Sequence, residues 1–112
     1  MLLLTQEFQT KLQEFIKEVN ERYKSDMANY GFRYKPEEDT VDLVGGSKYL
    51  KLEKRRGGVW GFVSTVDGTL HGAPVKVGDL LKAATYKAPA KHARGNILDG
   101  TAKYSWLGPD YL

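Results

Sequence analysis

The sequence predicts an α+β fold: a long N-terminal helix packed on a small antiparallel β-meander, followed by short C-terminal helical turns. Three observations support this fold class. Apolar residues recur at steps of three and four through residues 8–30, which is typical of an amphipathic helix. Apolar and polar residues alternate in short runs through residues 40–70, which is typical of strands. From residue 72 onward, Gly and Pro interrupt short helix-forming runs.

The predicted helix presents one apolar stripe. Thr5 is a suitable N-cap, and Gly31 suits the position that follows the last helical residue. The apolar positions of the stripe are Phe8, Leu12, Phe15, Ile16, Val19, Tyr23, Met27 and Tyr30. Because the stripe is too short to favour a coiled coil, we expect the helix to lie on a sheet.

The predicted meander is centred on a hairpin. Its strands cover residues 48–54 and 59–66, and the glycines of residues 55–58 (Arg-Arg-Gly-Gly) supply the positive φ of a tight turn. Residues 40–44 are an expected first strand, and an Asp-Gly pair turns the chain into a further strand at residues 69–71. We therefore expect three or four antiparallel strands.

The segment from Val75 to Gly100 is expected to be helical. Asp79 is a natural N-cap for a short helix that ends before Pro89. Residues 90–94 would add one helical turn, which Gly95 would close. The aromatic tail that follows should pack on the domain rather than extend into solvent.

Length and composition limit the possible classes of protein. A chain of 112 residues with 41% hydrophobic residues suits one domain with its own core, so we expect a single domain over residues 1–112. The absence of cysteine excludes disulfides and thiolate zinc sites. The apolar start, Met1–Leu4, is too short for a signal peptide or a membrane span, so we expect an intracellular protein with no membrane partner.

Positive charge is concentrated in the second part of the chain. Residues 1–40 carry 6 Lys and Arg against 8 Asp and Glu, whereas residues 41–112 carry 11 against 6. The densest basic cluster consists of Lys82, Lys87, Lys91, His92 and Arg94. Arg can hold a phosphate or carboxylate through two hydrogen bonds and Lys acts as a point charge, so this cluster is a predicted anion-binding site. The alternative is that Arg94 pairs with an internal carboxylate and that the lysines are solvated.

A second predicted contact for nucleic acid lies on the hairpin. If the hairpin loop has an even number of residues, Tyr49, Trp60 and Phe62 share one face of the sheet, while Arg55 and Arg56 lie at the tip. Aromatic side chains on a sheet can stack on the bases of single-stranded nucleic acid while cations hold its phosphates. The alternative is that the three aromatic side chains form the core beneath the helix.

The sequence offers no convincing catalytic or metal-binding constellation. Its two histidines, His71 and His92, are 21 residues apart, and no carboxylate lies at ligand spacing from both, so a metal site is not expected. Asp99 could orient His92 as a general base, but no nucleophile elbow or pair of catalytic carboxylates accompanies it. We therefore expect a non-enzymatic protein without a cofactor.

One segment resembles a known group of proteins. It reads K-V-G-D-L-L-K-A-A-T-Y-K-A-P-A-K-H-A-R-G-N-I-L-D and resembles a segment of small uncharacterised proteins of tailed bacteriophages. In these, Gly-Asp, an aliphatic residue, Lys and Ala lead to Pro-Ala and then to Ala-Arg-Gly-Asn. The resemblance is close from Val77 to Ile97 and looser from Lys48 to Asp99, and it departs at Tyr86, where Trp is common. It implies a phage origin and a place in the host cytoplasm, and it implies no catalytic residues because the family has no assigned activity.

Together these observations lead to three functional hypotheses. The leading one is a non-enzymatic phage accessory protein that binds a phosphate-bearing partner, above all nucleic acid, through the basic cluster. The second is a protein that binds and inhibits a host protein or an anti-phage defence factor. The third is a sponge for a small nucleotide signal, which needs a concave pocket and a homo-oligomer.

Overall fold

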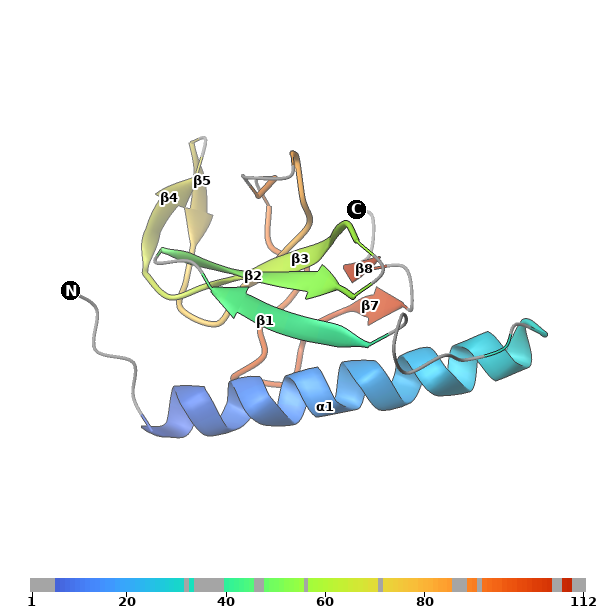
Figure 1. The fold of residues 1–112 in the computed structure, drawn as a ribbon. Helices are drawn as coiled ribbons and strands as arrows, with labels where there is room; N and C mark the ends of the chain where they lie inside the picture. Colours follow the sequence, from blue (N-terminus) through green and yellow to red (C-terminus); the bar gives the residue numbers. More distant parts are fainter. Residues whose placement is uncertain are drawn as a thin grey trace.

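The computed structural model places a long helix beneath a four-stranded antiparallel sheet (Figure 1). The structure describes residues 6–31, 33, 40–45, 48–55, 57–70, 72–85, 89–90, 92–105 and 108–109. Several residues that carry predictions lie outside this part of the chain: Thr5, Arg56, His71, Tyr86, Lys87 and Lys91.

The helix α1 (Gln6–Asn29) confirms the predicted N-terminal helix. Six positions of the predicted stripe are buried: Phe8, Leu12, Phe15, Val19, Tyr23 and Met27. Tyr30, the last position of the predicted stripe, is 66% exposed, because the helix ends before it. Gly31 has a φ of 78°, and its N–H donates to the Ala28 carbonyl oxygen at 3.1 Å. It therefore terminates the helix in the way the sequence predicts.

The sheet is an antiparallel meander with one added strand. Its strands lie in the order β1-β2-β3-β6, and they are β1 (Val41–Gly45), β2 (Tyr49–Lys54), β3 (Val59–Ser64) and β6 (Leu80–Leu81). Two further hairpins are formed by β4 (Gly68–Leu70) with β5 (Ala73–Val75), and by β7 (Tyr104–Ser105) with β8 (Gly108–Pro109). The first three predicted strands are confirmed, whereas the strand predicted at residues 69–71 pairs with β5 and not with the meander.

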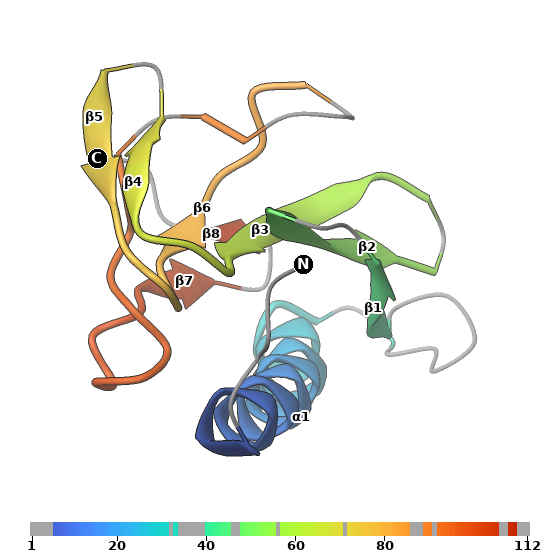
Figure 2. The same ribbon diagram turned by 90° about the vertical axis from the view of Figure 1, so that its left-hand side faces the viewer.

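Two cores lie on opposite faces of the sheet. α1 covers one face, and the β4–β5 hairpin rises from the other (Figures 1 and 2). The core on the α1 side joins the buried helix residues to Leu52, Val63 and Leu80. The core on the far side joins Phe62 and Leu81 to residues of β4 and β5. The sheet is therefore the middle layer, and neighbouring residues of β3 and β6 contribute to different cores.

A β-bulge changes the predicted face of Trp60. The pairing of β2 with β3 shifts by one residue between Leu52 and Glu53, which leaves an extra residue on β3. Trp60 turns toward α1, where its ring centroid lies 6.0 Å from that of Phe15, whereas Phe62 belongs to the far core. The prediction that these two β3 aromatic residues share a face is wrong, because it assumed unbroken alternation.

The described residues of the 79–96 segment, which are 79–85, 89–90 and 92–96, are extended and paired in place of the predicted helical turns. The Leu80 N–H donates to the Gly95 carbonyl oxygen at 2.9 Å, and the Arg94 N–H donates to the Leu80 carbonyl oxygen at 2.7 Å. β6 also pairs with β3. In the described part of this segment, the predicted helix after Asp79 and the predicted turn before Gly95 are therefore both wrong. Pairing on both sides of β6 satisfies its backbone groups without a helix.

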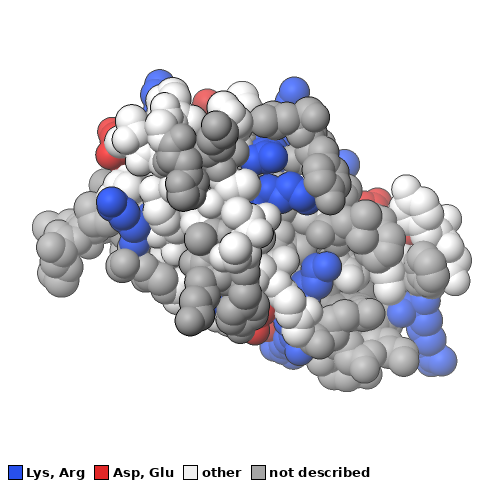
Figure 3. Space-filling view, turned by 90° about the horizontal axis from the view of Figure 1, so that it is seen from above, with Lys and Arg blue, Asp and Glu red and all other residues white. Residues whose placement is uncertain are grey.

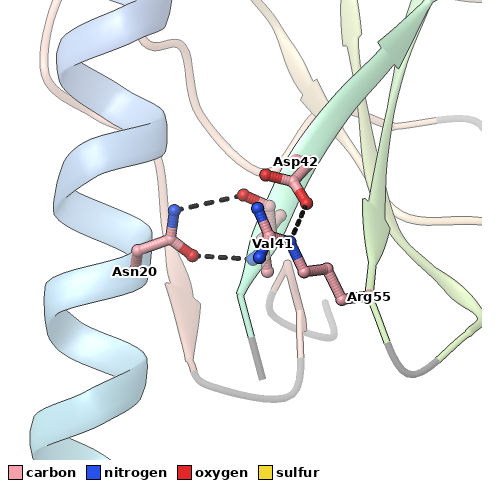
Figure 4. A network of polar contacts seen from close by, with 4 residues as sticks. All are labelled: Asn20, Val41, Asp42 and Arg55. Carbon is pink, nitrogen blue, oxygen red and sulfur yellow. Dashed lines mark hydrogen bonds and ion pairs between the residues drawn. The ribbon is translucent and has the colours of Figure 1, made fainter. Parts of the chain in front are cut away.

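A side chain of α1 closes the outer edge of β1 (Figure 4). The Asn20 carboxamide donates to the Val41 carbonyl oxygen at 3.1 Å and accepts the Val41 N–H at 2.7 Å. It therefore occupies the place that a neighbouring strand would take. This contact fixes the position of the helix relative to the sheet and blunts one end of an otherwise open sheet edge.

Candidate functional site

The paired segment is anchored by a polar network around Asn96. The Asn96 carboxamide nitrogen donates to the Asp79 carboxylate and to the Val77 carbonyl oxygen, both at 2.9 Å. Its oxygen accepts the Leu98 N–H at 2.7 Å. Asp79 is buried, and its carboxylate also accepts the Lys76 N–H at 2.8 Å. The Asp and Asn of the Gly-Asp and Gly-Asn pairs in the sequence motif therefore have a structural role.

The glycines of the same two pairs permit close packing. Gly78 and Gly95 have φ values of 89° and 90°, which residues other than glycine rarely adopt. A Cβ on Gly78 would lie 2.7 Å from the Asn96 carboxamide oxygen, and a Cβ on Gly95 would overlap the Thr101 carbonyl group. This close packing explains why glycine precedes Asp79 and Asn96 in the motif. It also fixes the position of the segment that pairs with β6.

Lys82, a predicted anion-binding residue, is placed near Lys54, a residue that sequence analysis missed. Lys54 ends β2, Lys82 follows β6, and both are half-buried. Burial, and secondly the charge of Lys82, lowers the pKa of Lys54. Two ammonium groups that influence each other in this way repel, and an anion bound between them would relieve the repulsion.

The framework around this lysine pair is made of tightly packed backbone. The Lys82 ammonium donates to the Pro109 carbonyl oxygen at 3.0 Å. Pro109 packs over Gly61 of β3, where an added Cβ would approach the proline Cγ to 2.8 Å. Gly61 and Pro109 are both buried, so the acceptor that positions Lys82 is rigidly placed.

Arg94 and His92 lie on the segment that pairs with β6. The Arg94 guanidinium donates to the His92 carbonyl oxygen at 2.6 Å. His92 has a φ of 71°, which is uncommon for a residue other than glycine, and its side chain is exposed. Part of the hydrogen-bonding capacity of Arg94 is therefore used to hold this backbone bend.

Arg55, at the tip of the hairpin, forms an ion pair with β1. Arg55 is exposed, and its guanidinium donates to the Asp42 carboxylate of β1 at 2.9 Å (Figure 4). An exposed ion pair of this kind contributes little stability. Arg56, Lys87 and Lys91 lie outside the described residues, and their predicted part in anion binding stays a prediction.

The predicted stacking platform is wrong for two of its three members. Trp60 and Phe62 are each 2% exposed, so neither ring presents a face to a base. Tyr49 is half-buried and packs against the far core. Core formation, the alternative left open by the sequence, is what these side chains do, because the two faces of the sheet are covered by α1 and by the β4–β5 hairpin.

On the face of the molecule turned away from α1, the charged side chains that the structure describes are mostly basic (Figure 3). Lys and Arg side chains predominate over Asp and Glu on this face, and several of them gather near its centre. A surface with an excess of positive charge attracts negatively charged partners over a distance, before they make contact. This distribution agrees with the excess of positive charge in residues 41–112.

A groove that sequence analysis missed lies between α1 and the residues before β7. Its volume is about 350 Å³, and its lining residues are Lys11, Glu14, Phe15, Glu18, Ile97, Leu98, Asp99, Gly100, Ala102 and Tyr104. The Tyr104 hydroxyl donates to the Glu18 carboxylate at 2.7 Å. Burial, and secondly Glu18, raises the pKa of Tyr104 to about 12. No local motif could reveal the groove, because its two walls are about eighty residues apart in the sequence.

The described part of the chain contains neither a metal-binding cluster nor a membrane-spanning helix. No group of three or more His, Cys, Asp and Glu side chains is arranged to hold a metal ion there. No helix among the same residues is long and apolar enough to span a membrane.

Comparison with known proteins places the chain in a family without naming an activity. Residues 3–108 match the model of DUF7717, a family of unknown function. No curated protein and no solved structure matches the chain.

Proposed function

The chain belongs to DUF7717, a family of unknown function, and we propose that it is a non-enzymatic protein that binds a phosphate-bearing partner. Nucleic acid is the leading candidate for that partner. The proposed contacts are Lys54 and Lys82, together with Arg94 and His92 of the segment that pairs with β6.

The observation that carries this proposal is the placement of Lys54 near Lys82. Burial lowers the pKa of Lys54, and the charge of Lys82 lowers it further, so holding the two ammonium groups near each other costs free energy. A phosphate carries the charge that would offset this cost, and lysine is a common phosphate ligand. The basic face in Figure 3 adds long-range attraction for a polyanion.

The proposed binding mode relies on phosphates rather than on bases. Because Trp60 and Phe62 are buried, base stacking on the hairpin contributes nothing to it. Contacts to phosphate are independent of sequence and strongly dependent on salt. The proposal therefore expects similar affinity for different sequences and a modest difference between single strands and duplexes.

Fluorescence anisotropy with labelled oligonucleotides at 50 and 200 mM salt tests the proposal. With about four phosphate contacts, the affinity for duplex DNA should fall roughly 150-fold over this range. The variant Lys54→Gln/Lys82→Gln keeps about two contacts and should bind more weakly. Its affinity should fall only roughly 12-fold over the same range of salt. The control Lys17→Gln/Lys24→Gln removes the same charge from exposed positions of α1 and should bind like the parent protein.

Two results would overturn the proposal. Absence of any salt-dependent binding to DNA, RNA or nucleotides would exclude a phosphate-bearing partner. Equal losses in the two double variants would mean that net charge, and not the lysine pair, attracts the oligonucleotide.

The biological setting is proposed from the sequence resemblance. Similarity of residues 77–97 to proteins of tailed bacteriophages supports a phage accessory protein that acts in the cytoplasm of an infected host. Isolation of bound nucleic acid from infected bacteria, with the Lys54→Gln/Lys82→Gln variant as control, would test this setting. Recovery of a host protein and no nucleic acid would favour an inhibitor of a host or defence factor.

A further inference from the structure

The groove between α1 and the Ile97–Tyr104 segment has an apolar floor. Phe15, Ile97 and Tyr104 are buried beneath it, and Leu98 is half-buried at its side. A volume of about 350 Å³ is within the range of sites that receive a ligand group. The groove is also open along one side. The groove combines these apolar side chains with polar and charged ones, so charge decides which ligands it favours.

The rim of the groove is acidic on both walls. Glu14 and Glu18 border it from α1, and Asp99 borders it from the opposite turn, while Lys11 is the one cation among its lining residues. Three carboxylates against one ammonium give the lining residues a net negative charge, although a further cation, Arg22, lies over the Tyr104 ring. This sign is opposite to that of residues 41–112 as a whole, so the groove is chemically distinct from the lysine pair.

Two of the carboxylates are held in place by internal donors. The Tyr104 hydroxyl orients Glu18 at 2.7 Å. The hydroxyl and the N–H of Thr101 both donate to Asp99, and these hydrogen bonds lower the pKa of Asp99. Both carboxylates are therefore held in place before any partner arrives, which reduces the entropy lost on binding.

The aromatic floor already shows how it contacts a cation. The Arg22 guanidinium lies over the Tyr104 ring, 5.0 Å from the centroid, as in a cation–π contact. Long basic side chains combine an alkyl stem with a charged end. Such a stem suits the floor of the groove, and its charged end suits the carboxylates of the rim.

We propose that this groove binds a Lys or Arg side chain of a partner polypeptide. The alkyl stem lies on Phe15 and Tyr104, and the cationic end lies between the carboxylates of α1 and that of Asp99. A free small amine is a poorer occupant, because small ligands bury most of their surface and this groove leaves one side open. The inference does not depend on the proposed phosphate-bearing partner, since the two sites share no residue.

NMR titration of the ¹⁵N-labelled full chain tests the proposal. The probe is a short peptide of alternating Leu and Arg, and the reference peptide has Glu in place of Arg. The Arg peptide should shift the amides of Leu98, Gly100 and Ala102, and the Glu peptide should not. The variant Glu14→Gln/Asp99→Asn neutralises two rim charges and should lower the affinity for the Arg peptide roughly tenfold.

A matched control separates the groove from the general charge of the helix. Glu7→Gln/Glu21→Gln removes the same charge from exposed positions of α1 that do not line the groove and should bind the Arg peptide like the parent protein. Equal losses in both double variants, or shifts confined to other parts of the chain, would overturn the proposal. Spermidine binding in the groove at least as tightly as the Arg peptide would overturn a polypeptide occupant.

Discussion

Replacing Asn20 by Ala is the sharpest test of how α1 is attached to the sheet. In the folded chain the Asn20 carboxamide satisfies both backbone groups of Val41, at 2.7 and 3.1 Å (Figure 4). Val41 has no exposed surface, so water does not readily replace the lost partner. The substitution therefore leaves a buried N–H and a buried carbonyl group unsatisfied.

The expected loss follows from these two groups. Each unsatisfied buried backbone group costs about 1–3 kcal/mol, and partial relaxation makes a total of about 2–4 kcal/mol reasonable for Asn20→Ala. A domain of this size has a free energy of unfolding of about 5–15 kcal/mol. The loss should therefore lower the melting temperature by roughly 10 °C or more.

Urea unfolding followed by circular dichroism measures the effect. Gln13→Ala is the matched control, because Gln13 is an exposed carboxamide of the same helix and should change stability by less than about 0.5 kcal/mol. Asn20→Asp adds a second test. Its carboxylate accepts the Val41 N–H but faces the Val41 carbonyl oxygen, which raises the pKa of the carboxyl group in the folded chain. Its deficit relative to the parent should therefore shrink as the pH falls toward about 4, the unfolded pKa of Asp, and level off below it.

Equal and small losses for Asn20→Ala and Gln13→Ala would refute this reasoning. They would mean that the apolar contacts of α1 position the helix without help from the carboxamide. A pH-independent deficit for Asn20→Asp would refute the assignment of the Asn20 nitrogen as the donor to Val41.

Two further predictions concern the network below the paired segment and the groove. Gly95→Ala should cost more than about 3 kcal/mol in urea unfolding, because it combines a φ of 90° with overlap of the Thr101 carbonyl group; a loss below about 1 kcal/mol would contradict the packing. Burial and Glu18 raise the pKa of Tyr104 to about 12, so folding favours the protonated phenol. The stability that the protonated phenol contributes should be fully present below pH 10 and be lost between pH 10 and about 12. The loss in the free energy of unfolding should reach roughly 2 kcal/mol after allowance for solvent in the groove. Tyr104→Phe, compared with the parent at pH 9 and pH 11.5, should show a smaller loss over this window, and an equal loss would exclude Tyr104 as its source.

The helix and the hairpin could be predicted from sequence because their signals are local. The stripe from Phe8 to Met27 has the period of a helix. The two glycines after Arg56 mark the hairpin turn, and both have positive φ. In these segments the local pattern and the tertiary structure favour the same conformation.

The segment after Gly78 could not be predicted in the same way. Leu80 to Ala84 are good helix formers, yet Leu80 and Leu81 form β6 between β3 and the residues before Asn96. Helix propensity is a weak preference that pairing with a sheet can override. The network of Asn96 and Asp79 then holds the extended conformation.

The candidate sites were predicted only in part, because both depend on distant pairs of segments. The basic neighbours of Lys82 in the sequence predict its part in anion binding, but its placement near Lys54 arises from the order of strands in the sheet. The face of Trp60 depended on a bulge that local alternation does not reveal. The groove required the Ile97–Tyr104 segment to return to α1.

The most direct test of the proposed function is the pKa of Lys54, measured by NMR titration of its side chain with and without a saturating single-stranded oligonucleotide. In the free protein this pKa should lie below the ordinary lysine value, as burial and Lys82 dictate. A phosphate between the two ammonium groups should raise it by about half a unit or more. An oligonucleotide that binds and leaves the pKa of Lys54 unchanged would contradict the account.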